Sequence, residues 1–139
     1  METSDLYQLA ADHRHQVHSF PLKESDACSV ELNQRCYIAL SDRLSGKKEK
    51  TQLAHELGHC EYAGFYNYHS PFEIRSRCET RADRWSILKL IPVDELRDAI
   101  RGGCSNVWEL SEHFGVTEDF MTKAIKFYTE RLELSLMEK

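Results

Sequence analysis

The pattern of apolar and polar positions changes along the chain from alternation to helical spacing. Alternation over residues 27–32 and 35–40 predicts two antiparallel strands, with Asn33 in the turn between them. A similar alternation from His15 to Phe20 precedes them. Much of the remaining chain has apolar residues three and four positions apart, as in amphipathic helices. The pattern therefore predicts an α+β fold, in which a small antiparallel sheet packs on helices.

Capping and helix-breaking residues indicate where these helices begin and end. The first helix is expected to have Ser4 or Asp5 as its N-cap, and Gly64 is the expected C′ residue of the second. A capping box that starts at Ser70 begins a long helix, which Pro92 ends. Three shorter helices follow it. The expected helical segments are residues 4–13, a segment whose first turn holds Lys47, Lys48 and Lys50 and which runs to about residue 63, 71–91, 93–101, 106–114 and 117 to beyond 128.

Composition limits the class of protein. The chain has 139 residues, of which 41% are hydrophobic and 29% charged, so we expect a single domain with a packed core. Within it, residues 1–92 would form the main part and residues 93–139 a helical C-terminal subdomain. A net charge of −5 argues against direct binding to nucleic acid. No apolar run is long enough for a bilayer, and residues 1–20 lack a signal-peptide pattern. We therefore expect a cytoplasmic protein that does not contact membranes.

Several His, Cys and Lys residues are expected to be ordinary surface or core residues. The five cysteines are odd in number and lack a CxxC pair, which favours free thiols over disulfides or a Cys-rich zinc site. Three histidines near the start of the chain lack the helical spacing of metal ligands, so we expect them to be solvated. Three lysines are expected to lie in the solvated first turn of the second helix. These residues are Cys28, Cys36, Cys60, Cys78 and Cys104, then His13, His15 and His18, and Lys47, Lys48 and Lys50.

The strongest chemical signal is the sequence His-Glu-Leu-Gly-His at residues 55–59. Residues four apart lie on one face of a helix, so His55 and His59 would direct two imidazoles at one point, which suits Zn²⁺. Glu56 lies about 100° further round the helix, where it can reach a water on the metal without binding the metal itself. Gly58 costs about 1 kcal/mol of helix stability relative to Ala, which indicates that another backbone comes close.

A zinc site of this kind needs a third protein ligand, and the next helix offers one. Glu79 and Asp83 are four residues apart and share a face. We expect Glu79 to bind the metal and Asp83 to accept a hydrogen bond from a zinc-binding histidine. Glu73 and Glu61 are alternative ligands, but Glu73 is placed to cap its helix and Glu61 points away from the histidine pair. The other interpretation, an exposed acidic pair balanced by arginines of its own helix, is less consistent with the motif upstream.

These motifs together resemble the ImmA/IrrE family of zinc metallopeptidases. The resemblance covers about residues 5–92, with Glu-Thr-Arg-Ala-Asp at residues 79–83 and Leu-Ile-Pro at residues 90–92. It implies a compact zincin-like fold and one Zn²⁺ per chain. Family members of this type accompany phages or mobile elements and relieve repression by cleaving a helix-turn-helix repressor. The implied roles are zinc ligand for His55, His59 and Glu79, catalytic residue for Glu56, and partner of a zinc ligand for Asp83.

The predicted function is that of an enzyme, a zinc endopeptidase that acts on a protein partner. Three protein ligands leave one zinc position open for a water, and Glu56 would take its proton. A further group must stabilise the oxyanion. Tyr62, three residues after His59, is the first candidate. Less specific candidates are Tyr66, Tyr68, His69 and His113.

Two alternative functions are weaker. The first is a non-proteolytic anti-repressor or partner-binding module with a structural zinc, but structural sites usually close four protein ligands and no fourth with good spacing is evident. The second is DNA binding by the C-terminal helices, whose apolar spacing resembles a helix-turn-helix. Glu118 and Asp119 begin the last of these helices, where a base-reading helix would need neutral or basic residues. We therefore expect the C-terminal helices to form core or bind a partner.

Overall fold

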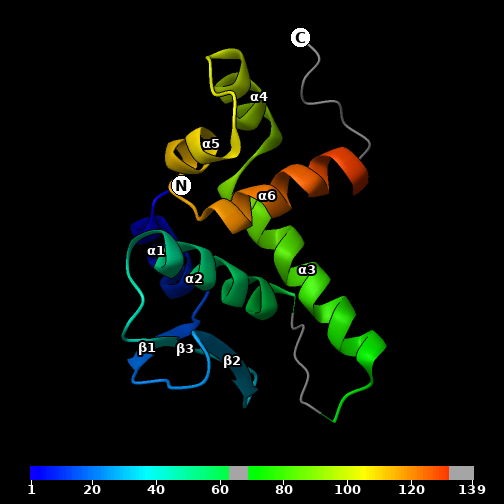
Figure 1. Cartoon of the computed structure of the whole chain (residues 1–139). Helices are drawn as coiled ribbons and strands as arrows, with labels where there is room; N and C mark the ends of the chain where they lie inside the picture. The colour runs from blue at the N-terminus through cyan, green and yellow to red at the C-terminus, as the bar shows by residue number, and fades with distance from the viewer. Residues whose placement is uncertain (63–68, 132–139) are drawn as a thin grey trace.

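The computed structural model describes residues 1–62 and 69–131, and it confirms the α+β class. Figure 1 shows the sheet on one side of helix α2 and the C-terminal helices on the other, with α3 alongside. No helix in the described ranges has the length and apolar character needed to cross a membrane. The elements in order are α1 (Thr3–Asp12), β1 (Gln16–Phe20), β2 (Ala27–Leu32), β3 (Arg35–Ser41), α2 (Gly46–Glu61), α3 (Phe72–Leu90), α4 (Val93–Arg101), α5 (Val107–Phe114), α6 (Glu118–Lys126) and a π-helical turn (Phe127–Arg131).

The three strands form one mixed sheet in the order β1-β3-β2. β2 and β3 are antiparallel, as predicted, and the turn between them has positive φ at Asn33 (51°) and Gln34 (64°), the conformation that a tight hairpin requires. β1 pairs with β3 in parallel, so the prediction of a purely antiparallel sheet is wrong. The chain reverses direction between β1 and β2 and again at the hairpin, which leaves β3 running the same way as β1.

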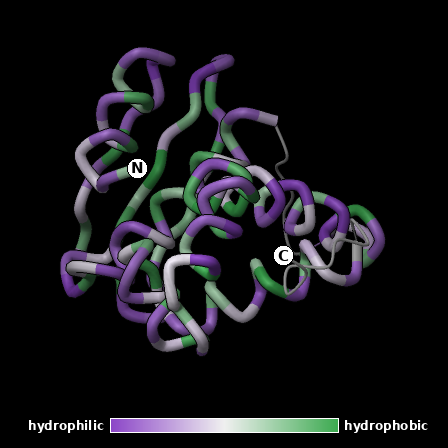
Figure 2. Tube along the Cα trace, turned by 90° about the horizontal axis from the view of Figure 1, so that it is seen from above, coloured by the Kyte–Doolittle hydropathy of each residue, from purple (hydrophilic) through white to green (hydrophobic). Residues whose placement is uncertain are grey.

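A single apolar core connects the sheet, α2 and the C-terminal helices. In Figure 2 hydrophobic and hydrophilic positions alternate along the helices, as expected for helices that bury one face. The C-terminal helices contribute fully buried side chains to this core, which confirms that they form core. Fully buried members include Leu6, Ile38, Leu53, Leu57, Leu96, Val116, Met121 and Tyr128.

The predicted helix ends are confirmed in the C-terminal part of the chain. α3 ends before Pro92, and α4 matches the predicted segment residue for residue. The Oδ1 of Asn106 accepts a hydrogen bond from the backbone N–H of Glu109 at 2.9 Å. Thr117 caps α6 in the same way, and Gly115 adopts the left-handed conformation with φ of 69°. These signals are local to each helix end, so they could be identified without knowing the fold.

Two predicted N-caps are wrong. The N-cap of α1 is Glu2, not Ser4 or Asp5, and the Asp5 carboxylate accepts a hydrogen bond from the Glu2 backbone N–H at 2.7 Å. α3 begins at Phe72 with Pro71 as its N-cap, because the Pro71 carbonyl accepts the first hydrogen bonds of the helix. The predicted capping box at Ser70 is therefore displaced by one position.

The far end of α2 also differs from its prediction. α2 ends at Glu61 with Tyr62 as the C-cap, and the predicted role of Gly64 lies outside the described residues. At the other end of the helix, Lys50 is not solvated. Its side chain is only 6% exposed, and its Nζ donates a hydrogen bond to the Phe114 carbonyl at 2.6 Å. A carbonyl at a helix end lacks an intrahelical partner, so Lys50 supplies one and ties α2 to α5.

Candidate metal centre

The centre lies between α2 and α3, which pack closely because Gly58 has no side chain. A Cβ at Gly58 would lie 2.7 Å from the carbonyl oxygen of Ala82 and 2.9 Å from its Cα. This close approach confirms the reason predicted for a glycine in the helix. His55 and His59 flank Gly58 on α2, and Glu79 and Asp83 flank Ala82 on α3. The contact therefore brings the two pairs face to face.

Three of the predicted ligands meet at one point. The Oε2 of Glu79 lies 2.7 Å from Nε2 of His55 and 3.1 Å from Nε2 of His59. One donor atom from each residue lies within 4.8 Å of the other two. The two imidazoles are one helical turn apart, as their spacing predicted, and α3 supplies the carboxylate opposite them.

Asp83 holds the far side of the His55 ring. Its Oδ1 lies 3.0 Å from Nδ1 of His55. A carboxylate at this position fixes the ring orientation and leaves Nε2 directed at the shared point. Asp83 also lies 3.4 Å from the Nζ of Lys123 on α6. The alternative interpretation, in which Asp83 pairs with an arginine of its own helix, does not describe these contacts.

Lys123 is a neighbour of the centre that the sequence interpretation missed. A cleft of about 230 Å³ beside His55 is lined by residues of α2, α3 and α6, among them Asp83 and Lys123. Lys123 comes 40 residues after Asp83, and nothing in the local pattern of α6 indicates this contact. The C-terminal helices therefore border the centre as well as completing the core.

The electrostatics of His55 show that the donor set suits a cation. Burial lowers the pKa of His55, but hydrogen bonds to Asp83 and Glu79 outweigh it and raise the pKa to about 10. His55 is then an imidazolium at neutral pH, with one N–H directed at each carboxylate. A divalent cation between His55, His59 and Glu79 would replace the proton on Nε2, as metal binding commonly does. Two imidazoles and one carboxylate are also a usual donor set of open zinc sites.

Glu56 lies on the buried side of α2 and is 6% exposed. Burial and the nearby charge of Glu56 raise the pKa of the Cys28 thiol on β2. The helix that carries Glu56 packs against β2, which is an edge strand of the described sheet because the strand order is β1-β3-β2. The carboxylate predicted to move protons is thus buried, next to His55 in the sequence, on the helix that packs against the sheet.

The structure assigns no role at the centre to the remaining predicted site residues, and some of them lie outside the described residues. Tyr62 is the C-cap of α2 and is 50% exposed, and its role as oxyanion stabiliser stays a prediction. Tyr66 and Tyr68 lie outside the described residues. Glu73 is exposed in the first turn of α3. Glu61 points away from the centre, as expected, toward two histidines near the start of the chain.

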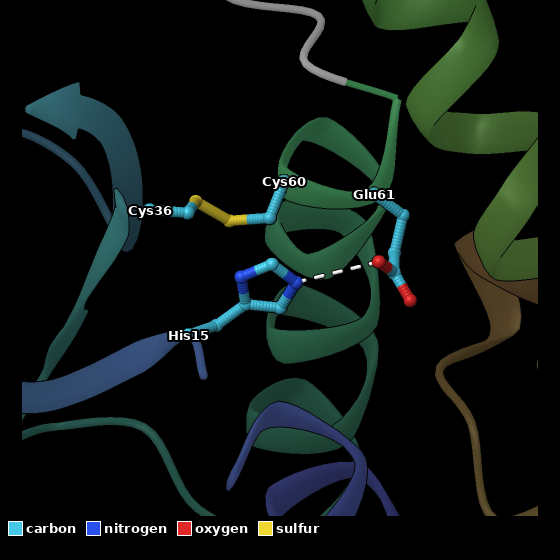
Figure 3. Close-up of a disulfide and its surroundings, with 4 residues drawn as sticks. All are labelled: His15, Cys36, Cys60 and Glu61. Atoms are coloured by element: carbon cyan, nitrogen blue, oxygen red, sulfur yellow. Dashed lines mark hydrogen bonds and ion pairs between the residues drawn. A yellow bond between two sulfur atoms is a disulfide. The ribbon is translucent and has the colours of Figure 1, made fainter. Parts of the chain in front are cut away.

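Those two histidines and two of the cysteines have partners that were not predicted. His13 is exposed, as predicted, whereas His15 is partly buried. Nδ1 of His13 lies 2.5 Å and Nε2 of His15 3.3 Å from the Glu61 carboxylate. Cys36 and Cys60 form a disulfide, shown in Figure 3, so the prediction that all five cysteines are free is wrong. Cys28 and Cys104 are free thiols, as predicted.

An α+β fold that joins two histidines of one helix to a carboxylate of the next, beside a buried glutamate, is typical of metallopeptidases. The chain matches the family model of a metallopeptidase family, described as the IrrE N-terminal-like domain, over residues 10–126. The protein belongs to this family. The match extends beyond residue 92 and includes α4, α5 and α6. Comparison with curated proteins finds no match.

Proposed function

We propose that this protein is a zinc-dependent endopeptidase. The proposal rests on two imidazole nitrogens, of His55 and His59, that lie 2.7 and 3.1 Å from one carboxylate oxygen of Glu79. The buried Glu56 is the residue after His55. His55, His59 and Glu79 would hold one Zn²⁺ per chain. Bound zinc supplies a Lewis acid that polarises a carbonyl and lowers the pKa of water toward neutrality.

The protein side chains would divide the remaining work. His55 and His59 would bind the ion through Nε2, and Asp83 would keep the His55 ring in place by accepting a hydrogen bond from Nδ1. Glu56 accepts a proton from the attacking water on a carboxylate oxygen and passes it to the nitrogen of the leaving amine. Tyr62 is proposed to donate a hydrogen bond to the oxyanion. His55, His59 and Glu79 would leave one position on the zinc ion open, which favours a catalytic over a structural metal.

The proposed substrate is a helix-turn-helix repressor encoded in a phage or mobile-element operon, whose cleavage relieves repression. This part rests on the resemblance of the HELGH and Glu79–Asp83 motifs to the ImmA/IrrE family. Among the described residues β2 is an edge strand, which is consistent with a peptide substrate, because an extended segment can add to a sheet edge through main-chain hydrogen bonds. Such binding would place a peptide on the strand that packs against α2, the helix that carries Glu56 and the histidine pair.

The decisive experiment compares wild type with Glu56→Gln on repressor proteins encoded beside the gene, with and without a chelator. Gln has nearly the shape of Glu but cannot accept the proton, so cleavage should fall by about 100-fold or more while zinc content and unfolding midpoint stay unchanged. Glu118→Gln, at an exposed position of α6, is the matched control and should cleave normally. Cleavage by Glu56→Gln at the wild-type rate would remove Glu56 from the mechanism. Derepression without cleavage would support the partner-binding alternative instead.

A further inference from the structure

A second group of side chains that could hold a metal ion lies at the C-terminal end of α2, on the side away from Glu79. Figure 3 shows the His15 ring between the Cys36–Cys60 disulfide and Glu61. The group joins the start of β1, the strand β3 and the last turn of α2. The proposed peptidase mechanism uses none of these side chains.

The two nitrogens of His15 face different groups. Nε2 lies 3.3 Å from the Glu61 carboxylate, and Figure 3 shows the other ring nitrogen on the side of the sulfurs. The donor atoms of His15, Cys36 and Cys60 all lie within 4.8 Å of one another. A carboxylate on the far nitrogen is the arrangement that commonly orients metal-binding histidines. His55 and Asp83 have the same relation in the first centre.

Burial of the donors and their place at a helix C-terminus also favour a cation. Cys36 is 5% exposed, and His15 and Cys60 are partly buried. The C-terminal end of a helix carries partial negative charge, which stabilises nearby cations. A cleft of about 270 Å³ lined by His15, Cys36 and Cys60 opens to the surface here, so an ion has an entry path and a fourth ligand has room. Glu61 itself is held by His13 at 2.5 Å.

We propose that Cys36, Cys60 and His15 form a second cation site when the disulfide is reduced, separate from the peptidase centre. Two thiolates and one imidazole select a soft d¹⁰ ion such as Zn²⁺ or Cu⁺. A phosphine reductant supplies the two electrons that break the S–S bond and takes the oxygen of one water, leaving two thiols. Each thiol then loses its proton on binding, so two protons are released per ion.

The disulfide and the bound cation exclude each other, because both need the same two sulfur atoms. Oxidation of the thiols by a two-electron oxidant such as a peroxide would therefore release the ion, and reduction would restore the site. The redox state of the surroundings would thereby decide whether the end of α2 is held to β3 by a covalent bond or by a metal ion.

The test uses the full chain and Co²⁺ as a spectroscopic probe, with oxidised and phosphine-reduced protein compared side by side. Thiolate ligands give Co²⁺ an intense near-ultraviolet charge-transfer band, whereas the donors at the first centre include no sulfur and give none. We expect the band only in reduced protein, together with one more Zn²⁺ bound per chain than in oxidised protein. Absence of the band in reduced wild-type protein would refute the site, and this comparison needs no variant.

Variants then identify the ligands. Cys36→Ser should abolish the band in reduced protein, and His15→Ala should weaken Co²⁺ binding at least tenfold. Cys28→Ser is the matched control, because it removes a thiol from the neighbouring strand β2 and should leave the band intact. A band that survives Cys36→Ser, or that disappears in Cys28→Ser, would assign the thiolate elsewhere and overturn the proposal. Loss of peptidase activity has no bearing on either measurement.

Discussion

Replacing Gly58 by Ala adds one methyl group where α3 packs against α2. The new Cβ would lie 2.7 Å from the carbonyl oxygen of Ala82 and 2.9 Å from its Cα, and ordinary contacts begin at 3.4 Å. Both atoms belong to the backbone, so no side-chain rotation relieves the overlap. The two helices must therefore separate locally by about 0.7 Å to restore ordinary contact.

Two effects of opposite sign decide the stability of this variant. Ala is more favourable than Gly inside a helix by about 1 kcal/mol, whereas overpacking a close contact costs about 1–3 kcal/mol. We expect a net loss of about 0–2 kcal/mol in the free energy of unfolding. The metal centre is less tolerant, because its ligands must stay within about 0.5 Å of their working positions. Glu79 and Asp83 flank Ala82 and would move with it, so zinc affinity should fall at least tenfold.

A chelator competition titration measures the affinity, and urea unfolding of the metal-free chain measures the stability. Lys48→Ala, an exposed change on the same helix, should alter neither. If Gly58→Ala binds zinc as tightly as wild type, the close approach of the two helices is not what positions the ligands, and the reasoning fails.

Three other substitutions test single contacts. Glu79→Ala should remove zinc from the purified chain, and elemental analysis that finds unchanged zinc would exclude Glu79 as a ligand. Asp83→Ala should weaken zinc binding by about 10–100-fold, less than His55→Ala, and equal affinity for wild type and Asp83→Ala would show that Asp83 does not orient the ligand. Tyr128→Phe should destabilise the fold by about 1–3 kcal/mol, because the buried Tyr128 hydroxyl donates to the Ile91 carbonyl at 2.6 Å. Burial raises the pKa of Tyr128 to about 12, above its value near 10 in unfolded chains. The hydroxyl's contribution should thus be complete below pH ~10 and fade as pH rises toward ~12, and a wild-type minus variant difference that stays constant over that range would contradict it.

The sequence alone determined the features that depend on local geometry. Residues four apart in a helix share a face whatever the helix packs against, so the pairing of His55 with His59 and of Glu79 with Asp83 could be stated before the fold was known. The caps at Asn106 and Thr117 follow the same logic, since each involves atoms three residues apart. The glycine in the motif also carried information, because a destabilising residue inside a helix indicates a close neighbour.

The sequence did not determine which buried faces meet. Apolar periodicity identifies the buried face of an element but not the element that covers it, so the contact of Lys123 with Asp83 and of Lys50 with the Phe114 carbonyl could not be predicted. The parallel pairing of β1 with β3 depended on how many times the chain reverses between them. In the same way, Cys36 and Cys60 are 24 residues apart in the sequence, and only the packing of β3 on α2 brings their sulfurs together.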